Sequence, residues 1–154
     1  MPLLIVVRHA KSDWTHDVSD EQRPLNARGQ REAPLVGPWV AEHVGAPDLV
    51  ICSTAGRARE TLVRSGLTGE VRHDPRLYGA TPQELMSVVE EVPEDVGAVA
   101  LVGHNPGLSD LVGVLTGEAV ELKTSAVAVV RWEGGWPDVW GRGADLVSHA
   151  TPRG

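Results

Sequence analysis

Two histidines and two arginines, His9, His104, Arg8 and Arg57, are residue types suited to chemistry on a phosphoryl group. Arginine offers a planar, permanently charged fork that matches phosphate oxygens. Histidine serves as a nucleophile or proton carrier near neutral pH, and nearby positive charge keeps its attacking nitrogen unprotonated. If the fold brings the four together, they predict phosphoryl transfer through a phosphohistidine, with electrostatic stabilisation of the transferred group.

These residues stand near the ends of apolar segments that have the composition of strands. Without polar alternation, such runs are typical of a parallel sheet covered on both faces. Ligands of such sheets bind at the carboxyl ends of the strands, so the histidines and arginines are expected to converge on one edge. The runs are Leu3–Val7, Asp48–Cys52, a short Glu70–His73 and Ala98–Val102.

Segments of helical period separate the runs and predict an α/β domain. We expect a first helix from the Asn26 cap to about Val44, which Pro34 and Pro38 should bend or split. Three further helices are expected: Ala55–Ser65, the Thr81 capping box to about Glu91, and Asn105-Pro106 to near Thr116. After Gly117 the pattern changes, and Thr124–Trp132 and Asp145–Ala150 predict an antiparallel edge. Residues 1–150 are expected to form a single domain, followed by a frayed tail over 151–154.

Composition limits the classes of function. The net charge of −7 argues against a general nucleic-acid or anionic-membrane binder, so any bound anion needs a local cluster of positive charge. A single cysteine excludes an internal disulfide and a cysteine-rich zinc site, and the carboxylates show no metal-ligand spacing, so neither metal nor cofactor is expected. With no signal peptide and no long apolar run, the chain reads as cytoplasmic.

Four blocks in order resemble the histidine phosphatase superfamily, the phosphoglycerate mutase-like group. They are Arg8-His9, Pro24–Gly29 before a helix, Ser53–Thr61, and Gly103–Pro106. Within that group, the segment Arg8–Ser12, the Arg23-Pro24-Leu25 block and the small size resemble SixA-type phosphohistidine phosphatases.

The resemblance implies a three-layer α/β sandwich with a mostly parallel six-stranded sheet in the order 3-2-4-1-5-6, whose edge is antiparallel. It implies that His9 is the phosphorylated nucleophile, that Arg8 and Arg57 hold the phosphoryl oxygens and that His104 completes the pocket opposite His9. Further contacts to the substrate are expected from the residues near the mouth and at the loop and helix starts: Arg23, Ser12, Lys11, Asn105 and Tyr78. His16, His43, His73 and His149 are expected to be structural or solvated.

The proton donor of the mutase branch has no counterpart in the stretch Asp74–Gly79, where Tyr78 is nearest to the expected place. An ester releases an alkoxide and needs a strong acid, whereas a phosphohistidine can release neutral imidazole. This difference favours phosphohistidine on a phosphotransfer protein as the substrate. The chain is also too short to carry a lid over the site, which favours the same substrate. A phosphomonoesterase with Glu84 or Asp74 as the acid, and a non-catalytic phospho-ligand module, remain alternatives.

Cys52 suggests a further enzyme class, because Cys52–Arg57 superficially resembles a cysteine phosphatase loop. A backbone loop that circles a phosphate needs one residue more than the four between Cys52 and Arg57, and Arg59 stands too far along the chain. Cys52 also ends an apolar run, where a small buried side chain is ordinary. We therefore expect Cys52 to be structural.

Overall fold

The computed structural model describes residues 1–15 and 17–153; His16 and Gly154 lie outside the described residues. One six-stranded sheet has the order β3-β2-β4-β1-β5-β6. The strands are β1 (Leu3–Arg8), β2 (Leu49–Cys52), β3 (Glu70–His73), β4 (Ala98–Gly103), β5 (Val127–Arg131) and β6 (Asp145–Ala150). The first four pair in parallel, and β5 and β6 add the expected antiparallel edge.

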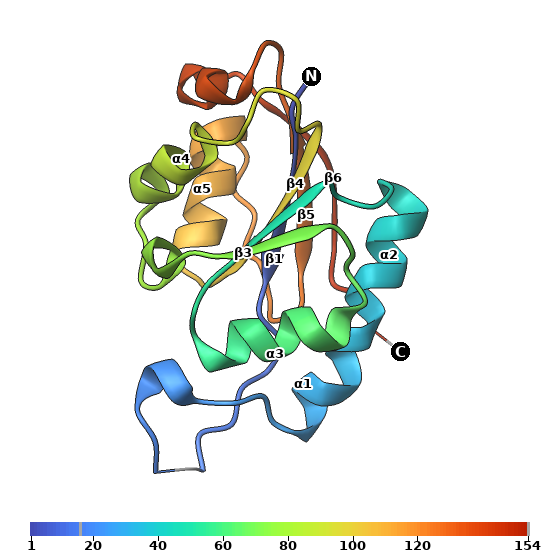
Figure 1. Ribbon diagram of the computed structural model, residues 1–154, viewed down its shortest axis with the longest axis vertical. Coiled ribbons are helices and arrows are strands. Elements are labelled where there is room, and N and C mark those ends of the chain that lie inside the picture. Colours follow the sequence, from blue (N-terminus) through green and yellow to red (C-terminus); the bar gives the residue numbers. More distant parts are fainter. Residues whose placement is uncertain (16, 154) are drawn as a thin grey trace.

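Helices cover both faces of the sheet and make the three-layer sandwich (Figure 1). The α-helices are α1 (Ala27–Glu32), α2 (Val36–His43), α3 (Gly56–Ser65), α4 (Pro82–Val89) and α5 (Gly107–Thr116). Short 3-10 helices are η1 (Asp20–Gln22), η2 (Ala33–Leu35), η3 (Pro75–Leu77) and η4 (Trp136–Gly141). Of the described helices, none combines the length and apolar character needed to cross a membrane.

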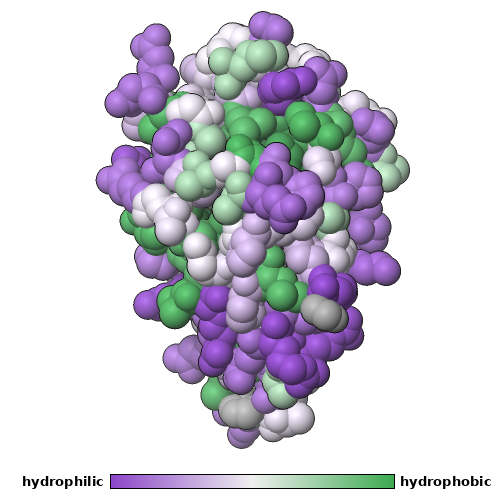
Figure 2. All heavy atoms as spheres, turned by 90° about the vertical axis from the view of Figure 1, so that its right-hand side faces the viewer, coloured by the Kyte–Doolittle hydropathy of each residue, from purple (hydrophilic) through white to green (hydrophobic). Residues whose placement is uncertain are grey.

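Each face of the sheet has its own apolar core. On one face, strand residues pack with α4, α5 and η4 around side chains such as Leu101 and Leu111. On the other, α2 and α3 close over Ile5 and Val102. The end of the molecule near α1, α3 and η1 receives the carboxyl end of β1, and on the face drawn in Figure 2 this end is mainly hydrophilic.

Local chemistry accounts for the ends of most helices. The Asn26 side chain accepts a hydrogen bond from Gly29 N and starts α1, and Pro34 lies where the helical segment breaks into η2. Pro38 stays within α2. The Thr81–Glu84 capping box begins α4 as expected, and Gly66 and Gly117 end α3 and α5 in the left-handed conformation.

Two expectations about strands are wrong. All four residues of β3 are exposed, because β3 is an edge strand, so Glu70–His73 is not covered on both faces. β5 begins at Val127 rather than at residue 124, because Ser125 adopts a positive φ of 65° in the turn that precedes the strand.

In the C-terminal segment Arg153 makes an ion pair with Glu32.

Candidate active site

His9 lies directly after β1, 7% exposed, and its ring is fixed by the backbone. Nδ1 lies 2.7 Å from the carbonyl oxygen of Ala10. A carbonyl only accepts, so Nδ1 carries the proton and the neutral ring has its lone pair on Nε2. Burial lowers the pKa of His9 to about 3, and the charges of His104, Arg57 and Arg8 act in the same direction. At neutral pH, Nε2 is therefore a free nucleophile.

His104, which follows β4, faces His9 with 5.2 Å between the ring centroids. β1 and β4 are neighbours, with Arg8 opposite Gly103, and this register brings the two histidines together. His104 Nε2 lies 2.7 Å from the hydroxyl oxygen of Ser53, and that oxygen accepts a hydrogen bond from Ala55 N. Burial first, and then Arg57, lower the pKa of His104 to about 4. Because the Ser53 oxygen already accepts from Ala55 N, we assign its hydroxyl proton to His104 Nε2, which places the proton of the neutral His104 ring on Nδ1.

Arg8 and Asn105 share one backbone acceptor. Arg8 Nη1 and Asn105 Nδ2 donate to the carbonyl oxygen of Leu122 at 2.9 and 2.7 Å. The Asn105 Oδ1 accepts from both the backbone and the hydroxyl of Ser109. These contacts tie the end of β1 and the start of α5 to the segment before β5. The side chain of Asn105 thus has a structural set of partners beside the pocket.

Arg57 and Arg23 meet on the carboxylate of Asp20. Arg57 donates to Asp20 O at 2.7 Å and to Asp20 Oδ2 at 3.1 Å, and Arg23 donates to Oδ1 at 3.0 Å. The Tyr78 hydroxyl donates to Oδ2 at 2.5 Å, and its ring stands edge-on to His104 with centroids 5.6 Å apart. The expected residues Arg57, Arg23 and Tyr78 therefore do converge, through an acid that the sequence analysis did not single out.

The loop after His9 is held against α1. Lys11 O accepts from Asn26 N, and Ser12 bridges Leu25 in antiparallel fashion. A Cβ on Gly29 would lie 2.1 Å from Lys11 O, so only glycine allows this approach. Ser12 Oγ accepts a hydrogen bond from Arg23 and so joins the cluster. Lys11 makes these contacts through its backbone, and they do not support its expected role in substrate binding.

Unpaired buried donors gather in this cluster. Among the described residues, six buried side-chain nitrogen or oxygen atoms have no hydrogen-bond partner. Four of them are Arg8 Nε, Arg23 Nε, Arg57 Nε and His104 Nδ1. Buried donors are normally satisfied, so this concentration indicates an anion-binding site. Within residues 1–15 and 17–153, no three metal-ligating side chains come together.

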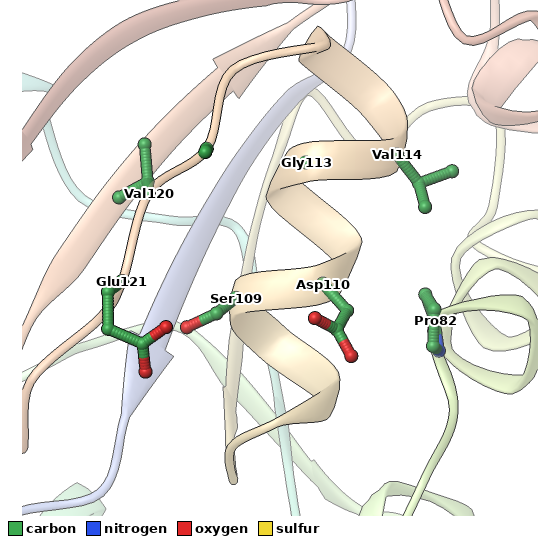
Figure 3. Close-up of a pocket in the computed structure, with 8 residues that line it drawn as sticks. Pro82, Ser109, Asp110, Gly113, Val114, Val120 and Glu121 are labelled. Carbon is green, nitrogen blue, oxygen red and sulfur yellow. The ribbon is translucent and has the colours of Figure 1, made fainter.

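A separate groove lies beside α5, lined by residues from α4, α5 and the segment that follows (Figure 3). Its ionisable groups are the carboxylates of Asp110 and Glu121, and its Ser109 hydroxyl is already bonded to Asn105. A groove with acidic and apolar walls does not suit a phosphoryl group. The cluster of His9, His104 and the surrounding arginines is therefore the better candidate site.

The two carboxylic acids considered as proton donors are engaged elsewhere. Glu84 accepts from Thr81 N in the capping box, and Asp74 binds the Arg76 guanidinium. Arg76 lowers the pKa of Asp74, which makes it a weaker donor at neutral pH. In the described part of the chain, neither carboxyl is hydrogen-bonded to His9, His104 or the arginines around them.

Sequence reasoning missed several residues that position the cluster. Thr61 accepts from Ala10 N at 2.9 Å and donates to Arg57 O at 2.7 Å, so it links the loop after His9 to α3. Ser53 orients His104, and Asp20 joins the arginines. Ser53 and Thr61 fall within the recognised Ser53–Thr61 block, but Asp20 stands in a loop with no comparable pattern.

Comparison with known proteins decides the family. Residues 4–100 match the histidine phosphatase superfamily (branch 1). The chain belongs to this superfamily. The match includes three of the four sequence blocks and ends within β4. His104 lies beyond the matched residues and reaches the site through the pairing of β4 with β1.

Relatives of this histidine phosphatase extend over nearly the whole chain. An uncharacterized protein of Mycobacterium tuberculosis (strain H37Rv) is 40% identical, over 96% of this chain and all of the relative. The Haemophilus influenzae SixA homolog, named as a phosphohistidine phosphatase, is 26% identical over 97% of this chain and 96% of its own. A structure from Nakamurella multipartitia, provisionally named phosphohistidine phosphatase SixA, has a TM-score of 0.92 at 31% identity and covers 99% and 97% of the two chains. The protein is thus a SixA-type histidine phosphatase, and its activity class is phosphatase.

Proposed function

We propose that the enzyme hydrolyses phosphohistidine, carried on a phosphotransfer protein, through a covalent phospho-His9 intermediate. One observation carries this proposal: the buried, neutral His9 has its Nδ1 committed to Ala10 O and its Nε2 free, beside four unpaired buried donors. The SixA-named relatives support the choice of substrate.

In the first step, His9 Nε2 attacks phosphorus and the phosphorus–nitrogen bond to the substrate imidazole breaks. The bonding electron pair goes to the departing ring nitrogen. Arg8, Arg57 and His104 Nδ1–H stabilise the negative charge on the transferring oxygens. Arg23, held to Ser12 and Asp20, supplies a further positive charge at the rim.

In the second step, water attacks phospho-His9 in the same pocket and releases inorganic phosphate. The phosphorus–nitrogen bond to His9 breaks, its electron pair returns to Nε2, and Ala10 O keeps the proton on Nδ1. No metal is needed in this scheme, because fixed cations and N–H donors supply the positive charge. Single-domain organisation over residues 1–150 and a cytoplasmic location stay predictions.

The test compares wild type, His9→Ala and His149→Ala in the presence of chelator. His149 is an exposed histidine on β6 and serves as the matched control. The substrates are a phosphohistidine protein, free phosphohistidine and 4-nitrophenyl phosphate. Wild type and His149→Ala should release phosphate from phosphohistidine, and His9→Ala should be inactive while keeping its circular dichroism spectrum.

Mass spectrometry after alkaline quenching should find one phosphoryl group on His9 in the wild type. Full activity of His9→Ala would overturn the mechanism. Turnover confined to esters would move the substrate to small phosphomonoesters, and phosphate binding without any turnover would favour a binding module.

A further inference from the structure

Asp20 is a carboxylate bound to two arginines of the site. Its two carboxylate oxygens accept three hydrogen bonds, from Arg23, Arg57 and Tyr78. These donors come from the loop before α1, from α3 and from the segment after β3, so the placement of Asp20 depends on the whole rim of the pocket. A negative charge here opposes phosphate binding, and its presence therefore needs an explanation.

The position of Asp20 is on the outer side of the pocket. Its side chain is 49% exposed, whereas that of Arg57, which it binds, is 7% exposed. His9 and His104 are also buried. Because His9 attacks from the inner end, the leaving group departs on the opposite side of phosphorus, toward the exposed rim. Tyr78 connects that rim to His104, since it contacts both His104 and Asp20.

The three donors determine what Asp20 can do there. Hydrogen bonds from Tyr78 and Arg23, and the charge of Arg57, hold the pKa of Asp20 well below its usual value. Asp20 is therefore ionised at neutral pH and acts only as an acceptor. It cannot protonate an ester oxygen, and it repels the negative charge that grows on such an oxygen. It attracts a substrate ring that carries an N–H, as a phosphohistidine protonated on its second ring nitrogen does.

We propose that Asp20 is a specificity-determining residue that accepts the N–H of the departing imidazole and so selects phosphorus–nitrogen substrates over phosphoesters. The substrate ring is protonated on the nitrogen that does not carry phosphorus. As the phosphorus–nitrogen bond breaks, its electron pair neutralises the ring, which leaves as imidazole with that N–H still bonded to Asp20. This inference rests on the proposed function and assigns the residue that sets its substrate class.

The test measures kcat/KM for free phosphohistidine and for 4-nitrophenyl phosphate with wild type, Asp20→Asn, Asp20→Glu and Glu21→Gln. Small substrates exclude effects of protein docking. Glu21, the exposed neighbour in η1, is the control for net charge, because its carboxylate makes no hydrogen bond or ion pair with the residues that the structure describes. Melting temperatures establish that each variant is folded.

We expect Asp20→Asn to lower the ratio of phosphohistidine to ester kcat/KM by roughly tenfold or more, which is the scale of one charge-assisted hydrogen bond. Asp20→Glu should keep most of the wild-type ratio, and Glu21→Gln should have the same ratio as the wild type. An equal fall for both substrates in Asp20→Asn would mean that Asp20 only holds Arg57, and would overturn the inference while leaving the proposed function intact. A wild type that prefers the ester would overturn both.

Discussion

The guanidinium carbon of Arg23 lies 3.6 Å from the centre of the Trp14 ring. Trp14 is 72% exposed, and Arg23 bonds to Ser12 and Asp20 at the rim of the pocket. A large exposed aromatic side chain stacked on an arginine is the kind of residue that dominates binding energy at protein interfaces. If the substrate is a phosphohistidine on a protein, as proposed above, we expect that protein to contact Trp14.

We accordingly expect Trp14→Ala to lower kcat/KM for a phosphohistidine protein about tenfold, with a much smaller change for 4-nitrophenyl phosphate. Steady-state kinetics with both substrates measures the difference. Trp140→Ala is the control, since Trp140 is also partly exposed but bonds to Glu90. Equal losses on the two substrates would argue that Trp14 serves only to support Arg23.

Ser53 is expected to set the tautomer of His104. Ser53→Ala removes the partner of Nε2, so we expect kcat to fall roughly tenfold while KM changes little. The nitrogen chemical shifts of His104 should reveal a mixture of tautomers in the variant. Ser65→Ala is the control, because that buried hydroxyl bonds to Leu62 O within α3. An unchanged kcat with unchanged shifts would contradict the assignment.

Stability should decline as the pH falls below about 6.5. His9 and His104 have folded-state pKa values near 3 and 4, below their ordinary value of 6.5, so between these values the unfolded chain binds more protons than the folded one. The free energy of unfolding therefore falls as the pH drops through this window, by about 1.4 kcal/mol per pH unit for each group. Urea unfolding at pH 7.5 and 5.0 measures the loss. His9→Asn should reduce it, and an identical pH dependence would count against the burial of a neutral His9.

Gly29→Ala should destabilise the protein and impair its activity. The added methyl group would press on Lys11 O, so the loop after His9 must move, at a cost of about 1–3 kcal/mol. Gly113→Ala in α5 is the matched control, because its Cβ would have ordinary contact at 3.8 Å and alanine favours a helix. Thermal melts and phosphatase assays of both variants test this prediction. A Gly29→Ala protein as stable as Gly113→Ala would contradict the close approach of Gly29 to Lys11 O.

Cys52 should play no part in catalysis. It is buried in the core between β2 and its neighbours, and burial raises the pKa of its thiol to about 12. We expect iodoacetamide at pH 8 to leave activity intact and the intact mass unchanged for the folded protein. Cys52→Ser should remain active, with some loss of stability. Rapid inactivation by the reagent would revive the cysteine mechanism.

Local patterns in the sequence predict the strands and the convergence of the histidines at one edge, whereas the order of the strands in the sheet is what the resemblance to the histidine phosphatase superfamily implies. The apolar runs fix β1, β2 and β4, and residues just after parallel strands must meet at one edge, which brings His9, Arg57 and His104 together. The sequence does not predict the solvent exposure of β3, because exposure depends on a strand's place in the sheet rather than on its own residues.

Asp20 escapes sequence reasoning for a related reason. The carboxylate of Asp20 accepts hydrogen bonds from Arg23, Arg57 and Tyr78, and only Arg23 is close to it in sequence. An acid in a polar loop looks like any solvated residue until the fold closes around it. The pairing of Ser53 with His104 likewise spans two strands.

The carbonyl oxygen of Leu122 accepts from both Arg8 and Asn105, so a backbone atom connects β1 to α5. Every residue type presents this acceptor, and an alanine scan of the segment leaves it in place. Side-chain mutagenesis is therefore blind to the connection. Changing the length of the loop between Gly117 and Leu122 would shift the acceptor itself, so insertions or deletions at a distance from His9 are expected to act on Arg8 where point substitutions do not.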